Sequence, residues 1–258
     1  MKKPQLVVAN WKMYLNIHDT SVLVNRLNKK VPLYRNVEVV LAPSYLSLQP
    51  VSMEIDHRKF RLAAQDGYFK DEGAYTGAIS FSQLRELVNY AIIGHSERRR
   101  YFGESLDEIR DKLSACVRNG ITPILCVGET KQERTQNETK QVLHDQIVTA
   151  LSDLTSEDIE NLVLAYEPVW AIGADEPAKP DTIDKAVDWI RYQVRELYGQ
   201  KAESSIRVLY GGSDEPEYVA GIMEIPGING LLVGRASLNF EEFSDIITGV
   251  HLSGLSNE

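Results

Sequence analysis

The chain has 258 residues, of which 43% are hydrophobic and 25% charged, a composition typical of a soluble globular protein. Its formal net charge of −9 disfavours nucleic acid and anionic membranes as partners. An anionic ligand therefore needs a site with local positive potential, which backbone amides and a few lysines can supply.

Simple sequence signals set further expectations about the environment. No run approaches the roughly 20 apolar residues of a membrane helix. Asn10 and Lys12 interrupt the N-terminal apolar run too early for a signal peptide. Cys116 and Cys126 form no CxxC pair and have no histidine cluster beside them. We therefore expect reduced, structural thiols in a cytoplasmic protein, with no metal site.

Short β-branched or apolar runs recur along the chain and predict eight strands. In chain order they are Gln5–Asn10, Val37–Ala42, Lys59–Gln65, Tyr90–Ile93, Ile121–Val127, Leu162–Tyr166, Ile206–Tyr210 and Gly230–Val233. Helix-period segments lie between most of them. Ser105–Asn119 is a predicted helix with one apolar face and a glycine directly after it. Lys131–Leu151 is predicted to form one long amphipathic helix. Asp181–Leu197 follows Pro180 and is predicted to open with an Asp cap.

Alternating strands and helices predict an α/β fold with a parallel sheet. Eight such units in this length favour a closed (β/α)8 barrel, a TIM barrel, as a single domain over residues 1–258. An open doubly wound sheet is the alternative. Against it, no GxGxxG follows the first strand and no GxxxxGK[ST] occurs anywhere.

Polar residues cluster at the carboxyl ends of the expected strands, where barrels of this type perform their chemistry. These strand ends carry Asn10-Trp11-Lys12, the run 94–99 (GHSERR), Glu167-Pro168, Gly211-Gly212-Ser213 and Gly234-Arg235. Residues far apart in sequence should therefore converge on one mouth of the barrel.

Each of these residues also has an ordinary structural interpretation, such as a rim lysine, an ion-paired glutamate or a simple glycine turn. His95 differs because a polar helical start follows it, and the positive end of a helix favours a neutral imidazole. Glu167 ends a buried strand, where desolvation is expected to raise its basicity. Glycines at the ends of the last two strands are typical of a phosphate cradle in such barrels.

At these motifs the sequence resembles the triosephosphate isomerase family over nearly its whole length. The matching stretches are NWKM at 10–13, GAYTG at 73–77, IGHSERR at 93–99, CVGET at 126–130, AYEPVWAIG at 165–173 and YGGS at 210–213. AYEPVWAIG and GHSERR are highly specific, and they occur in order with the right strand spacing.

The resemblance implies a role for each polar residue at the mouth. Glu167 removes a proton from the carbon next to the carbonyl and returns it to the neighbouring carbon. Neutral His95 donates to the substrate oxygens and shuttles the enediol proton. Lys12 supplies positive charge, Asn10 supports the same oxygens, and Glu97 positions Lys12.

The resemblance also implies how the phosphate is held. Backbone amides of Gly173, Ser213, Gly234 and Arg235 would bind it, while a lid over Pro168–Ala178 excludes water from the enediolate. No metal or organic cofactor is required, because the amides and Lys12 provide the electrostatic stabilisation.

The family also implies a homodimer. The loop that carries Thr76 would insert into the partner subunit and buttress Asn10 and Lys12 there.

Three places depart from the common family pattern. Arg235 stands where a second glycine is usual, and Ala78 replaces a carboxylate that usually pairs with an arginine across the dimer. The end of the lid, usually similar to GTGKTA, reads GADEPA and contains Asp175 and Pro177.

These motifs predict interconversion of dihydroxyacetone phosphate and D-glyceraldehyde 3-phosphate. The changes at Arg235 and in the lid resemble those of paralogues that isomerise L-erythrulose 1-phosphate to D-erythrose 4-phosphate, which is the first alternative. A non-catalytic phosphate-binding barrel is a distant second, since Lys12, His95 and Glu167 are all present.

Overall fold

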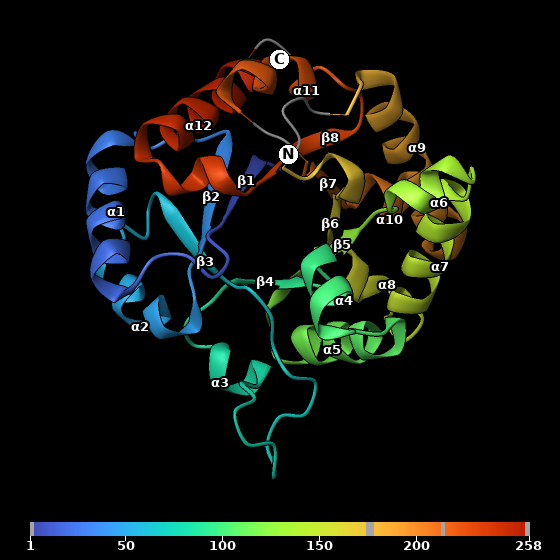
Figure 1. Cartoon of the computed structure of the whole chain (residues 1–258), viewed down its shortest axis with the longest axis horizontal. Coiled ribbons are helices and arrows are strands. Elements are labelled where there is room, and N and C mark those ends of the chain that lie inside the picture. Colours follow the sequence, from blue (N-terminus) through green and yellow to red (C-terminus); the bar gives the residue numbers. More distant parts are fainter. Residues whose placement is uncertain (1–2, 174–177, 213–214, 256–258) are drawn as a thin grey trace.

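The computed structural model describes residues 3–173, 178–212 and 215–255. In these ranges eight parallel strands form a closed barrel, hydrogen-bonded in chain order, and the last strand pairs with the first. Figure 1 shows this barrel inside a ring of helices. The strands are β1 (Gln5–Asn10), β2 (Val37–Ala42), β3 (Phe60–Ala64), β4 (Tyr90–Ile93), β5 (Thr122–Val127), β6 (Val163–Tyr166), β7 (Arg207–Tyr210) and β8 (Ile228–Val233).

The helices lie outside the barrel, mostly between successive strands. The α-helices are α1 (Ile17–Lys30), α2 (Tyr45–Glu54), α3 (Phe81–Leu84), α4 (Ser96–Phe102), α5 (Leu106–Arg118), α6 (Lys131–Thr135), α7 (Thr139–Leu151), α8 (Ser156–Ile159), α9 (Pro180–Tyr198), α10 (Gln200–Ser205), α11 (Val219–Met223) and α12 (Phe240–Leu255). The described residues also form three short 3₁₀ turns, η1 (Val169–Ala171), η2 (Pro216–Tyr218) and η3 (Arg235–Leu238).

The (β/α)8 barrel predicted from the sequence is confirmed, and every expected strand is present within two residues of its predicted ends. Two helix predictions are wrong in detail. The segment expected as one long helix is divided into α6 and α7, because Asn137 between them adopts a left-handed φ of 60° that ends the first helix. The expected Asp cap is also absent, since Lys179 occupies the N-cap of α9 and Asp181 lies in the first turn.

The barrel is held by two layers of apolar contacts. Along β1, Leu6 and Val8 point into the barrel, whereas Val7 and Ala9 pack against the helices. Strands that are buried on both faces explain why the sequence shows continuous apolar runs rather than alternation.

Both cysteines are buried free thiols, as expected. No helix within the described ranges has the length and apolarity needed to cross a bilayer.

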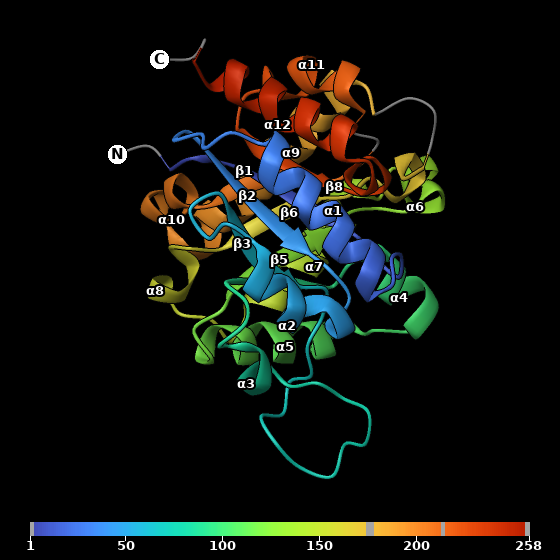
Figure 2. The ribbon, with the colours of Figure 1, turned by 90° about the vertical axis from the view of Figure 1, so that its left-hand side faces the viewer.

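The connection between β3 and α3 extends away from the barrel. Figure 2 shows residues 67–79 as a long projecting loop. Its shape is maintained by internal contacts: the rings of Tyr68 and Tyr75 lie 4.8 Å apart, and the Tyr68 N–H donates to the Ile79 carbonyl at 2.7 Å. Thr76 is exposed within it.

Candidate active site

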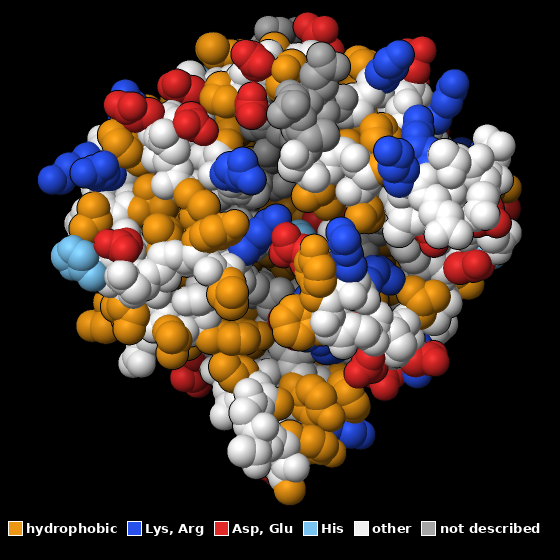
Figure 3. Space-filling model, in the orientation of Figure 1, with side chains coloured by type: hydrophobic (Ala, Val, Ile, Leu, Met, Phe, Trp, Pro, Cys, Tyr) orange, Lys and Arg blue, Asp and Glu red, His pale blue; other side chains and the backbone are white. Residues whose placement is uncertain are grey.

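The carboxyl ends of the strands surround a cavity at one mouth of the barrel. Figure 3 shows this face hollowed at its centre, with basic and acidic side chains around the opening. The cavity has a volume of about 420 Å³. Among its lining residues are the predicted site residues Asn10, Lys12, Glu97, Gly173, Gly234 and Arg235. The structure therefore brings most of the expected site together.

The backbone around Lys12 is held in an unusual conformation. Lys12 has a positive φ of 50°, which is uncommon for a residue other than glycine. Its N–H donates to the side-chain oxygen of Asn10 at 3.1 Å, and Gln65 Nε2 donates to its carbonyl at 2.9 Å. Gln65 also donates to the carbonyl of Ala42 at 2.9 Å. It therefore joins three strand ends, a role that no sequence motif indicated; the only signal was its position as the last residue of a predicted strand.

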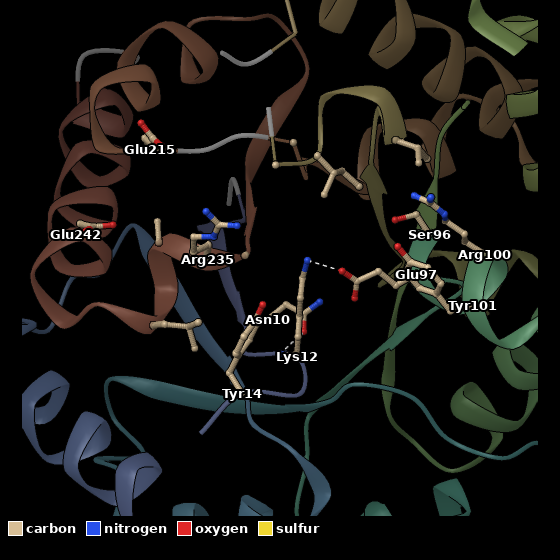
Figure 4. A pocket seen from close by; sticks show the side chains of 17 residues that line it. Asn10, Lys12, Tyr14, Ser96, Glu97, Arg100, Tyr101, Glu215, Arg235 and Glu242 are labelled. Carbon is tan, nitrogen blue, oxygen red and sulfur yellow. Dashed lines mark hydrogen bonds and ion pairs between the residues drawn. The ribbon is translucent and has the colours of Figure 1, made fainter. Parts of the chain in front are cut away.

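The side chain of Lys12 reaches across the cavity to α4. Its Nζ forms an ion pair with Glu97 Oε1 at 2.7 Å, drawn as a dashed line in Figure 4. Both side chains are partly exposed, Lys12 by 23% and Glu97 by 38%. The pair fixes the direction of the ammonium group and leaves it accessible from the cavity.

His95 is the N-cap of α4, so its ring orientation follows from the helix start. Its Nδ1 accepts the backbone N–H of Glu97 at 3.2 Å. That contact assigns the proton to Nε2, which faces Glu167 Oε1 at 2.9 Å. A ring that accepts at Nδ1 and donates at Nε2 is a neutral tautomer. Burial lowers the pKa of His95, but the facing Glu167 carboxylate outweighs it, so the net pKa is raised.

Glu167 is almost completely buried, with 2% of its surface exposed. Its other carboxylate oxygen accepts the N–H of Ser96 at 3.1 Å. Burial raises the pKa of Glu167, but His95, the Ser96 N–H and Lys12 together bring it below its ordinary value. The expectation of raised basicity is therefore wrong for this side-chain arrangement, because the sequence did not reveal that the base would contact the histidine.

Glu167 does not line the large cavity. It lines a neighbouring cavity of about 290 Å³ together with Cys126 and Gly128, among others. Its backbone is tightly enclosed, since a β-carbon on Gly128 would lie 1.8 Å from the Glu167 carbonyl oxygen. To reach a molecule in the large cavity, the Glu167 side chain must leave His95 while its backbone stays in place.

The expected lid is anchored at both described ends. At its start, Trp170 Nε1 donates to Glu129 Oε1 at 2.9 Å, and the Tyr166 hydroxyl donates to Glu129 Oε2 at 3.1 Å. At its far end, the N–H of Ala178 donates to the Tyr210 hydroxyl at 3.0 Å. The buried Glu129 thus holds η1, a role that the CVGET motif did not make explicit.

Some predicted positions lie outside the described residues. They are Ser213 and the lid departures at Asp175 and Pro177.

A buried carboxylate, a histidine and a lysine at the carboxyl end of a (β/α)8 barrel define an enzyme that transfers protons on a small anionic substrate. The sequence model of the family described as triosephosphate isomerase matches residues 5–250. The chain belongs to the triosephosphate isomerase family.

Individual relatives agree with this assignment. The chain is 40% identical over 250 residues to the triosephosphate isomerase of Carboxydothermus hydrogenoformans, covering 96% of this chain and 99% of the relative. It is 41% identical over 251 residues to that of Geotalea uraniireducens, covering 96% and 98%. It is 39% identical over 248 residues to that of Trichlorobacter lovleyi, again covering 96% and 98%.

Proposed function

We propose that this protein interconverts dihydroxyacetone phosphate and D-glyceraldehyde 3-phosphate. The observation that carries the proposal is the contact of His95 Nε2 with Glu167 Oε1 at 2.9 Å, beside Lys12 at the mouth of the barrel. Family membership supports the same activity, and the names of the relatives favour the three-carbon substrate over the four-carbon alternative.

The chemistry is a proton transfer between neighbouring carbons. The substrate separates Glu167 from His95, and the freed carboxylate removes the proton from the carbon next to the carbonyl. The bond electrons form an enediolate, and Glu167 returns the proton to the adjacent carbon. His95 donates its Nε2 proton to one substrate oxygen and recovers a proton from the other.

Charge stabilisation comes from groups that are already oriented. Lys12, held by Glu97, faces the phosphate and the developing oxyanion, and Asn10 supports the same oxygens. Backbone amides of four residues bind the phosphate: Gly173, Ser213, Gly234 and Arg235. The lid over residues 168–178 closes the site and excludes water.

A coupled assay on the purified protein tests the substrate. We expect both triose phosphates to be isomerised, with a kcat/KM for triose at least about tenfold above that for L-erythrulose 1-phosphate, since one carbon in a fitted pocket is worth roughly 1–3 kcal/mol. A triose kcat/KM more than about a hundredfold below the tetrulose value contradicts the proposal.

We also propose a homodimer of single-domain subunits, each formed by residues 1–258, in the cytoplasm. The projecting loop with Thr76 would insert beside Asn10 and Lys12 of the partner. Exposed apolar side chains support this, because Met13 is 97% and Phe102 71% exposed. Figure 3 shows hydrophobic side chains over the loop and between it and the mouth, a distribution typical of a buried interface.

Replacing Thr76 by arginine should therefore produce a monomer, because a charge at the tip of an inserted loop is desolvated without a partner. Activity should fall by about 10²-fold or more, since the loop buttresses catalytic groups. Light scattering at micromolar concentration checks the oligomeric state. Ser152→Arg, at another exposed site at the end of α7, is the control and should remain an active dimer. If light scattering shows the wild-type protein to be a monomer, the proposed homodimer is wrong.

A further inference from the structure

Two arginines that line the cavity, Arg235 and Arg100, form no ion pair with the described residues. Arg235, the first residue of η3, points its guanidinium into the opening that also receives Lys12 (Figure 4). Lys12 is paired with Glu97 at 2.7 Å. In the part of the chain that the structure describes, the Arg235 side chain takes part in no ion pair or hydrogen bond. Arg235 is therefore available to a ligand.

The surroundings of Arg235 favour an anion next to it. A β-carbon built on Gly234 would lie 3.9 Å from Lys12 Nζ, so the start of η3 runs close to the lysine ammonium. Glu97 offsets the charge of Lys12, whereas no carboxylate of the described residues lies within ion-pair distance of Arg235. Glu215 and Glu242 also line the cavity, but in Figure 4 they lie on the side of Arg235 away from Lys12. Among the residues labelled in Figure 4, no acidic side chain lies between Arg235 and Lys12.

We propose that the guanidinium of Arg235 binds the substrate phosphate directly, in addition to the backbone amides. The inference rests on the proposed function, because it takes the ligand to be a phosphorylated sugar. Guanidinium presents parallel N–H groups that match two phosphate oxygens, a geometry that neither an amide nor lysine provides. Arg235 is thus a binding residue of this chain at a position where the family pattern has glycine.

The phosphate does not react, so this contact is equally strong in the ground state and the transition state. Such uniform binding lowers KM and leaves kcat unchanged. The Arg235 guanidinium should also bind free inorganic phosphate, which then acts as a competitive inhibitor.

The test compares wild type with Arg235→Gln and Arg235→Lys. We expect Arg235→Gln to raise both the KM for dihydroxyacetone phosphate and the Ki of inorganic phosphate by about tenfold, as for loss of one charged hydrogen-bonding group. Its kcat should change less than about twofold. Arg235→Lys keeps the positive charge but loses the parallel N–H donors of the guanidinium. Its KM and phosphate Ki should therefore lie between those of wild type and those of Arg235→Gln.

Arg100→Gln is the matched control, because Arg100 is an exposed arginine that lines the same cavity from α4. Its Ki for phosphate should stay within about twofold of wild type, because Arg100 lies on the side of Lys12 opposite to Arg235 (Figure 4) and an exposed charge that makes no direct contact is screened by salt. An equal rise of the phosphate Ki in this control would overturn the proposal, because weaker phosphate binding would then reflect the overall charge of the cavity and not a direct contact with Arg235. An unchanged Ki in folded Arg235→Gln, verified by circular dichroism, would overturn it as well.

Calorimetric titration of inorganic phosphate separates the two proposals. A wild type that isomerises neither triose phosphate contradicts the proposed function, whereas weaker phosphate binding by Arg235→Gln still supports Arg235. A wild type that isomerises both but binds phosphate no better than Arg235→Gln contradicts only the role of Arg235.

Discussion

Glu167→Asp should lower kcat by about 10²- to 10³-fold, because misplacing a general base by about 1 Å costs a factor of this order. Shortening the side chain by one methylene withdraws the carboxylate from a substrate carbon in the cavity. The backbone cannot follow, since the Glu167 carbonyl is enclosed against Gly128. Initial rates in both directions on the two triose phosphates measure the effect.

The matched control is Glu215→Asp, the same chemical change at an exposed glutamate that lines the large cavity. It should keep kcat within about twofold, since it contributes no group to the proton transfer. If Glu167→Asp folds, dimerises and turns over at the wild-type rate, Glu167 is not the base. Glu167→Gln then discriminates further, because it keeps the length of the side chain and removes its basicity.

In the structure, the Glu167 carboxylate contacts His95 and Ser96 instead of the large cavity. Its contacts with His95 and Ser96 lower its pKa and hold it outside the large cavity. Substrate binding must therefore replace these contacts before proton transfer.

The sequence predicted the barrel well because its strands are continuous apolar runs and its reactive residues directly follow them. Strand ends meet at one face of a parallel barrel, so the location of the mouth followed from topology alone. Contacts between side chains of different strands could not be predicted in the same way. Gln65 carries no motif, and its two backbone partners are 53 and 23 residues away along the chain.

The opposite end of the barrel gives a second example. Arg207 in β7 forms an ion pair with Glu38 in β2 at 2.8 Å, and Tyr90 donates to the same carboxylate at 2.9 Å. In sequence, charged residues at strand starts resemble solvated rim positions. Their pairing depends on the closed barrel, which places β2, β4 and β7 around one interior.

Lys12→Met should lower kcat/KM by about 10³-fold, because it removes the preorganised charge beside both the phosphate and the oxyanion. Methionine is close in length and leaves the backbone contacts of Asn10 and Gln65 intact. Because the Lys12–Glu97 pair is partly exposed, its loss should change stability by no more than about 1 kcal/mol. Steady-state kinetics and thermal unfolding separate these two effects.

Lys185→Met, at an exposed lysine on α9, is the control and should behave as wild type. A kcat/KM for Lys12→Met within about tenfold of wild type would show that other groups stabilise the oxyanion.

Lys12 and Arg235 also differ in how their loss should divide between kinetic constants. If Arg235 binds the phosphate as proposed, removing it weakens a contact that does not change during the reaction, so KM alone should rise. Removing Lys12 takes away a charge that is needed most as the oxyanion develops, so kcat should fall as well. Glu97→Gln keeps the positive charge of Lys12 but removes the ion pair that orients its ammonium group. It should therefore reduce kcat less than Lys12→Met does. If it reduces kcat equally, the fixed orientation of Lys12 matters as much as its charge.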